Sequence, residues 1–148
     1  MKSKKNIAVL AKIISHLNLT KLEFLKAADL QSDAETTRFF NQQARLRNHF
    51  SQELLAFLGS LDINTEQIVL KRIDFNQRII TPVDGKSTVH IHRCLDLDQE
   101  LLEFYNQLLT VDSENALLCR QAQQLHDAVN TSRKLLATKS KIQNQILF

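Results

Sequence analysis

Glycine and proline are unusually scarce in this chain, and their scarcity limits how often the backbone can turn sharply. The 148 residues include 2 glycines and 1 proline. Hairpins of a β-sheet depend on tight turns, which usually need residues that accept positive φ. Long helices with few connections need such residues far less often. The composition therefore predicts an all-α fold, and the length suits a single domain over residues 1–148 with its own core.

Apolar residues recur at helical spacing in four segments, which span about 7–30, 34–61, 90–109 and 114–137 or beyond. This periodicity predicts a bundle of four long helices, each with one apolar stripe facing inward. The expected stripes are Ile7, Leu10, Ile14, Leu17, Lys21, Phe24 and Ala28; Phe39, Gln43, Leu46, Phe50, Glu53, Phe57 and Leu61; Leu95, Asp98, Leu101 or Leu102, Tyr105, and Leu108 or Leu109; and Leu118, Ala122, Leu125, Val129, Ser132 and Leu136.

Short polar breaks separate the segments within each half of the chain. Ser32 or Asp33 is expected to cap the second helix, and Asp112 or Ser113 the fourth. Gly59 stands where a C-cap of the second helix is expected.

The segment from 61 to 89 fits neither the helical nor the strand period, and it ends in a turn signal at residues 82–86. It is compatible with a short helix or with an extended crossover packed on the bundle. A connection this long lets the flanking second and third helices run parallel.

Cysteine use and hydropathy favour a cytoplasmic protein. Cys94 and Cys119 lack metal-binding spacing, and both are expected to be buried thiols in a reducing compartment. Lys12 interrupts the apolar run near the N-terminus, so no signal peptide is predicted, and no stretch is long enough to span a membrane. The net charge of +3 sits largely at the chain ends. So small an excess gives little reason to expect nucleic-acid binding.

The common catalytic and phosphate-binding motifs are missing from the sequence, so no enzyme activity and no cofactor are predicted. A four-helix bundle can hold two metal ions on inward-facing Glu and Glu-x-x-His groups. At the matching positions this chain has Gln43 and Gln123, and neutral amides supply no anionic charge. Glu23, Glu53, Asp98 and His126 are the candidates for a degenerate or mononuclear metal site.

Four polar residues fall on the expected inward stripes: Lys21, Gln43, Glu53 and Asp98. A buried charge is costly unless it is paired. One hypothesis is that Lys21 pairs with Glu53 or with Asp98. The alternative places these residues at the edge of the bundle, where their charged ends reach water.

Histidines offer two further arrangements. His90 and His92 alternate near the start of the third helix, where surface positions are expected and a zinc site is not. His49 and Glu53 are four residues apart, which predicts a pair on one helix face.

The order of several short runs resembles a ferritin-like family of small bacterial four-helix-bundle proteins of unknown function. The runs are Leu10 with Ile13 and Ile14, residues 23–28, Phe39 with Phe40, residues 47–54, Gly59, Leu101 with Leu102 and Tyr105, and His126 with Asp127. The resemblance covers most of the chain outside 61–89 and implies a ferritin-like bundle. It also implies an acidic residue in the first helix where Lys21 stands, while Asp98 matches an acidic position in the third.

These observations bound the function without naming a ligand. We expect a non-enzymatic bundle that self-associates, as a dimer, and acts as a structural, regulatory or stress-related interaction protein. A degenerate metal-binding bundle is the alternative.

Overall fold

The computed structural model describes residues 3–66 and 87–146, with the side chains of 87 and 140–146 left out. Within that part all regular structure is helical, which confirms the all-α prediction. The helices are α1 (Lys4–Asp29), α2 (Ala34–Ser60), α5 (Ser87–Val111) and α6 (Ala116–Ile146). Most of the segment expected to form a crossover, from 67 to 86, lies outside the described residues. No described helix combines the length and the apolar character needed to cross a membrane.

Local hydrogen bonds set the ends of the helices. Asp33 caps α2 by accepting from the Thr36 backbone N–H at 3.0 Å, as one of the two sequence alternatives proposed. Hydrogen bonds from Thr36 lower the pKa of Asp33. The cap of α6 was predicted wrongly, because the Asn115 side chain accepts from the Leu118 N–H at 3.1 Å. Asp112 instead accepts from the Asn115 amide at 3.2 Å.

The C-terminal end of α2 also differs from the prediction. Gly59 lies inside the helix, and the residue in the left-handed region is Asp62, with a φ of 60°. Aspartate tolerates this conformation because its short side chain can form local hydrogen bonds. The Ile63 N–H then donates to the Leu58 carbonyl at 3.2 Å and closes the helix end.

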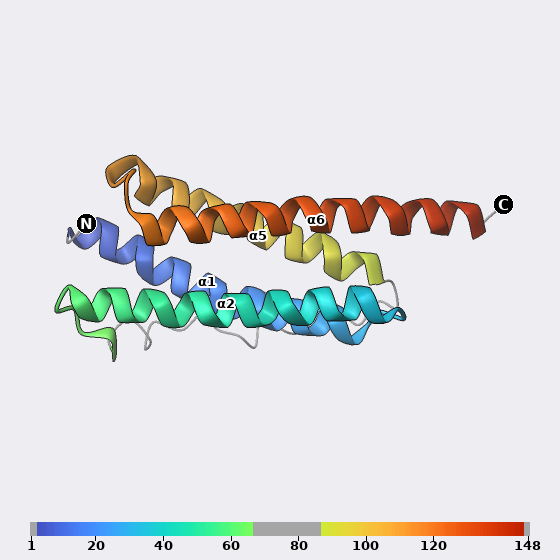
Figure 1. The fold of residues 1–148 in the computed structure, drawn as a ribbon, viewed down its shortest axis with the longest axis horizontal. Helices are drawn as coiled ribbons and strands as arrows, with labels where there is room; N and C mark the ends of the chain where they lie inside the picture. Colours follow the sequence, from blue (N-terminus) through green and yellow to red (C-terminus); the bar gives the residue numbers. More distant parts are fainter. Residues whose placement is uncertain (1–2, 67–86, 147–148) are drawn as a thin grey trace.

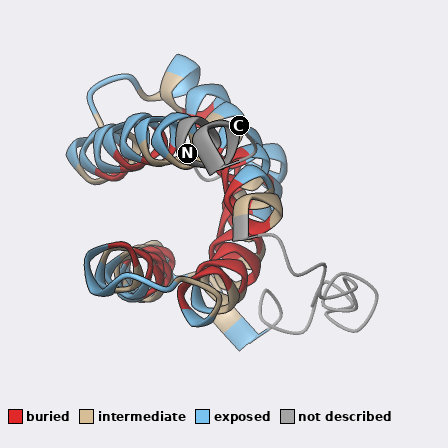
Figure 2. Cartoon of the chain, turned by 90° about the vertical axis from the view of Figure 1, so that its right-hand side faces the viewer, coloured by how far each residue is buried: buried red, intermediate tan, exposed pale blue. Residues whose placement is uncertain are grey.

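The four helices lie along an arc in the order α2, α1, α5, α6. Extensive contacts join α1 to α2, α1 to α5 and α5 to α6, whereas α2 and α6 approach each other closely at few points. Figure 2 looks along the helices and shows buried residues on the inner side of this arc. Figure 1 shows that α2 and α5 run in the same direction, opposite to α1 and α6. Each helix is therefore antiparallel to its neighbours.

The buried stripe of α2 is rotated from the one expected. The buried residues are Thr36, Phe40, Ala44, Arg47, Phe50, Ser51, Leu54 and Leu58. Phe39, Leu46 and Phe57 are only half-buried and pack against the two core clusters from the side. The stripe is displaced because Phe40 packs beside Phe24 of α1 and Arg47 turns inward to pair with Asp98 of α5.

The other stripes are closer to expectation. Leu10, Ile14, Leu17, Phe24 and Ala28 are buried on α1, as predicted, but Lys21 is only half-buried. On α5 the alternatives resolve to Leu101 and Leu108, both fully buried.

Helix α6 buries Leu118, Leu125, Val129 and Ser132 as expected. It also buries Gln121, whereas Ala122 and Leu136 are half-buried. Cys119 is exposed, so the prediction that both cysteines are buried was right for Cys94 alone.

A hydrogen-bonded polar layer joins three helices near one end of the bundle. The Tyr105 hydroxyl of α5 donates to Gln121 Oε1 of α6 at 2.5 Å. Gln121 Nε2 in turn donates at 3.4 Å to the Phe50 carbonyl and to Glu53 Oε1 of α2. Burial raises the pKa of the Tyr105 hydroxyl, which therefore stays protonated as a donor.

Removing this hydroxyl tests whether the layer holds α5 and α6 together. Tyr105→Phe leaves the buried Gln121 oxygen without its donor, so we expect a loss of about 1–3 kcal/mol in the free energy of unfolding. Chemical denaturation followed by circular dichroism measures it. The double variant Tyr105→Phe with Gln121→Leu removes both polar groups and should cost less than the two single changes added together. A strictly additive double variant would contradict the coupling.

Candidate functional site

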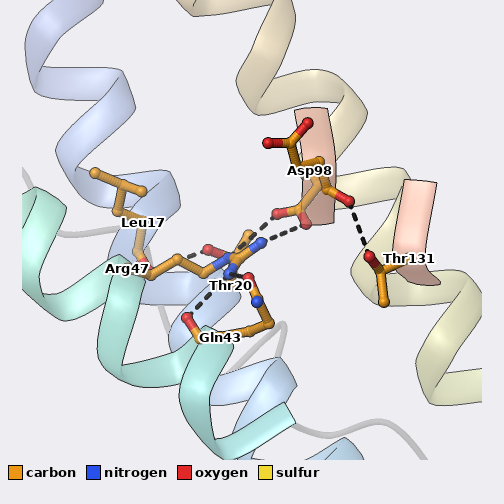
Figure 3. A network of polar contacts seen from close by, with 7 residues as sticks. Leu17, Thr20, Gln43, Arg47, Asp98 and Thr131 are labelled. Carbon is orange, nitrogen blue, oxygen red and sulfur yellow. Dashed lines mark hydrogen bonds and ion pairs between the residues drawn. The ribbon is translucent and has the colours of Figure 1, made fainter. Parts of the chain in front are cut away.

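The middle of the bundle holds a buried ion pair between α2 and α5. The Arg47 side chain is 0% exposed and that of Asp98 is 1% exposed. Arg47 Nη2 donates to Asp98 Oδ2 at 2.5 Å, and Arg47 Nε donates to Oδ1 at 3.3 Å. Figure 3 shows the guanidinium reaching from α2 toward the Asp98 carboxylate. The pair is therefore bidentate, the strongest geometry that arginine and a carboxylate can adopt.

The other terminal nitrogen of Arg47 is also engaged. Arg47 Nη1 donates at 2.9 Å to both the backbone oxygen and the side-chain Oε1 of Gln43, one turn earlier on α2. The guanidinium carbon lies 3.9 Å from the centre of the Phe24 ring on α1. This stacking is a cation–π contact in a water-free setting, where it is strongest. Arg47 is thus held by three helices at once.

The pair takes the role that the sequence assigned to Lys21, and that hypothesis was wrong. Lys21 Nζ donates to Asn48 Oδ1 at 3.3 Å, away from both proposed acidic partners. Gln43 does lie beside the central pair, as its inward register suggested. Arg47 was missed because arginine is seldom fully buried and lay off the more apolar stripe. Its place one turn after Gln43, in heptad register with Phe40 and Leu54, was the available signal.

Asp98 is buried, which was one of the two alternatives proposed for the inward polar residues. Burial raises the pKa of the Asp98 carboxyl, and the Arg47 guanidinium opposes this rise without cancelling it. Burial likewise raises the pKa of the Cys94 thiol, one turn earlier on α5, with the Asp98 charge adding to the effect. Cys94 is therefore a protonated core residue and no nucleophile at neutral pH.

The other candidate metal ligands lie in separate places. Glu23 is 0% exposed on α1 and faces Arg93 Nε of α5 at 3.5 Å and Lys26 Nζ at 3.7 Å. Glu53 is half-buried and forms an ion pair with Arg120 of α6. His126 is exposed on α6, near Asn130. In the described part of the chain, no three His, Cys, Asp or Glu side chains converge as metal ligands would.

The remaining histidines divide between core and surface. His90 was expected at the surface but is only 3% exposed, while His92 is exposed. His49 Nε2 lies 3.7 Å from Glu53 Oε1, which agrees with the predicted spacing on one helix face. His16 is buried, packs edge-on against Phe104 and lies 3.2 Å from Glu100 Oε2. Sequence analysis had not singled it out.

The chain was also compared with known families, proteins and structures. No family model, no curated protein and no solved structure matches the chain.

Breaking the central pair tests its energetics. Arg47→Met leaves the Asp98 carboxylate buried without its partner, so we expect a loss of about 3–5 kcal/mol in the free energy of unfolding. Asp98→Leu leaves the guanidinium unpaired and should cost a similar amount. The double variant Arg47→Met with Asp98→Leu replaces the pair with apolar groups and should recover most of the loss. Urea unfolding of the four proteins measures the cycle, and a double variant as unstable as the sum would contradict it.

The Glu53–Arg120 pair gives a pH-dependent contribution to stability. Burial opposes ionisation of Glu53, but the hydrogen bond and charge of Arg120, with Gln121 and His49, outweigh it and lower the pKa of Glu53 below 4.5. A carboxyl whose pKa is lowered by folding stabilises the folded state at pH values above its pKa in the unfolded chain. This stabilisation is lost as the pH falls through the pKa of the folded state. Glu53→Gln should therefore cost below about 1 kcal/mol at pH 7.

That cost should shrink as the pH falls below 4.5. Thermal unfolding of both proteins between pH 7 and pH 3 measures the trend. A difference that grows toward acid pH would contradict the assignment. Asp127→Asn, at an exposed α6 position, serves as the control.

Proposed function

We propose that this protein acts by binding: a self-associating helical bundle with a structural, regulatory or stress-related role and without a catalytic centre. The observation that carries the proposal is the buried ion pair in which Arg47 and Asp98 bind each other. Both oxygens of Asp98 accept from Arg47, and Arg47 Nη1 donates to Gln43. A buried carboxylate paired in this way is less available to a substrate or a metal ion.

We further propose that the bundle is ferritin-like and that the protein works in the cytoplasm. The parallel course of α2 and α5, with antiparallel neighbours on every side, supports the first idea (Figure 1). Cys94 and Cys119 are both free, which fits a reducing compartment.

The proposal of self-association rests on the seam of α6. Residues in strict heptad register along this helix are Leu118, Gln121, Leu125, Ala128, Ser132, Leu135, Lys139, Ile142 and Ile146. Those from Leu118 to Ser132 are buried, and Leu135 and Lys139 are half-buried. Lys139 Nζ lies 3.5 Å from Asp33, the N-cap of α2, so the seam has reached the end of the bundle there.

Beyond Lys139 the helix continues past the other three helices (Figure 1). Read from the sequence, the same heptad register continues through two apolar residues, Ile142 and Ile146. A second copy of the chain, paired about a two-fold axis, would cover this extension symmetrically.

Substitutions on and off the seam test self-association. The wild-type protein should sediment as a dimer, and Ile142→Ser with Ile146→Ser should shift it toward the monomer because the seam loses its apolar contacts. Gln143→Ser with Gln145→Ser changes neighbouring positions off the seam and should leave the dimer intact. Sedimentation velocity over a range of protein concentrations measures the equilibrium.

Two results would overturn the proposed function. A monomeric wild-type protein at high concentration would remove self-association. Stoichiometric iron or manganese in the purified protein, found by elemental analysis, would favour a metal-binding role instead.

A further inference from the structure

The outward face of α2 between residues 38 and 52 carries cationic and amide side chains and no acidic one. We call it the α2 basic face and define it as Arg38, Asn41, Gln42, Arg45, Asn48, His49 and Gln52, together with Lys21 and Leu25 of α1. Two adjoining hollows of about 540 and 590 Å³ lie on this face, and they share Asn41 and Arg45. The hollows form one continuous recess along the helix.

The positive charges of this face are largely uncompensated. Arg38 and Arg45 are exposed and take part in none of the ion pairs found among the described residues. Lys21 donates to the neutral Asn48. Two carboxylates lie at the ends of this face, and both are engaged: Asp33 holds Thr36 and Lys139, and Glu53 pairs with His49 and Arg120. The recess therefore presents a positive field to solvent.

The spacing of the charges suits a phosphodiester chain. Arg38 and Arg45 are seven residues apart on one side of α2, which is about 10 Å along the helix axis. Long arginine side chains at this spacing can reach two phosphates of the same strand. Lys21 lines the hollow that Arg45 shares, from the α1 side. Three cations along one recess can thus contact successive or alternate phosphates of a single strand.

We propose that the α2 basic face binds the phosphate backbone of a nucleic acid. Net charge pointed away from such a partner, because the excess of +3 is small and lies largely at the chain ends. It does not show how charges gather on one helix face. An acidic protein is the competing partner, but protein interfaces are built on large apolar or aromatic anchors. Leu25, 37% exposed, is the one large apolar side chain lining these hollows. The amides of Asn41, Gln42, Asn48 and Gln52 match the groups that contact phosphate, sugar and base edges.

The test uses the full-length protein and labelled 20-nucleotide oligomers, one single-stranded and one duplex, in fluorescence anisotropy. With about three phosphate contacts, affinity for the single strand should fall roughly 20-fold between 50 and 200 mM salt. Arg38→Gln with Arg45→Gln should weaken binding at least 10-fold at 50 mM salt and flatten the salt dependence. Both side chains are exposed, so the thermal midpoint should stay within a few degrees of the wild type.

Arg133→Gln with Lys134→Gln removes the same charge from exposed positions of α6 and is the matched control. Its affinity should stay within about twofold of the wild type. Three results would overturn the proposal: no binding of either oligomer at 50 mM salt, an equal loss in the control variant, or competition by poly-glutamate as strong as by an oligomer of equal charge. The site is separate from the α6 seam, so a monomeric protein that still binds would refute self-association alone.

Discussion

The buried pair of Arg47 and Asp98 constrains the rest of the bundle because it joins two helices that are not neighbours. Helices α2 and α5 each pack on α1, and the pair crosses between them with α1 alongside. Removing two charges from water is expensive, and only close bidentate contact with further hydrogen bonds offsets that cost. A shift of either helix by one residue would separate the charges. The pair therefore penalises alternative registers more strongly than an apolar contact would.

Elsewhere in the core, some buried polar groups have hydrogen-bond partners and others do not. Tyr105 and Gln121 form a closed hydrogen-bonded layer near one end. The buried oxygens of Glu23 lack a hydrogen bond of good geometry but lie near the cations of Arg93 and Lys26. Among the described residues, neither the buried ring nitrogens of His90 nor the Ser132 hydroxyl has a hydrogen-bond partner.

Helices α2 and α6 approach each other closely at few points. Polar side chains join them there: Glu53 pairs with Arg120, Gln121 donates to Glu53 and to the Phe50 carbonyl, and Asp33 pairs with Lys139. The outward side of α2 is left to solvent, and there the uncompensated arginines gather.

Much of the fold was predictable, because helix formation depends on local composition and spacing. The scarcity of glycine and proline and the helical spacing of apolar residues predicted four helices. Their predicted ends lie mostly within a few residues of the observed ones. The inward register of Asp98 and Gln43 also followed from spacing alone, although it left open whether they lie in the core or at its edge. The fourth helix was expected to reach Ala137 or beyond, and it extends to Ile146.

Only the tertiary structure decided which charges meet. Arg47 is a residue type that a sequence pattern assigns to the surface, and its burial depends on Asp98, 51 residues away, and on the ring of Phe24. The same holds for the α2 basic face, since neighbours on α1 decide whether an arginine is paired or left open. By itself, the sequence determined that this chain forms amphipathic helices, because their periodicity is local. Packing and charge pairing between distant segments then determined which faces of those helices meet.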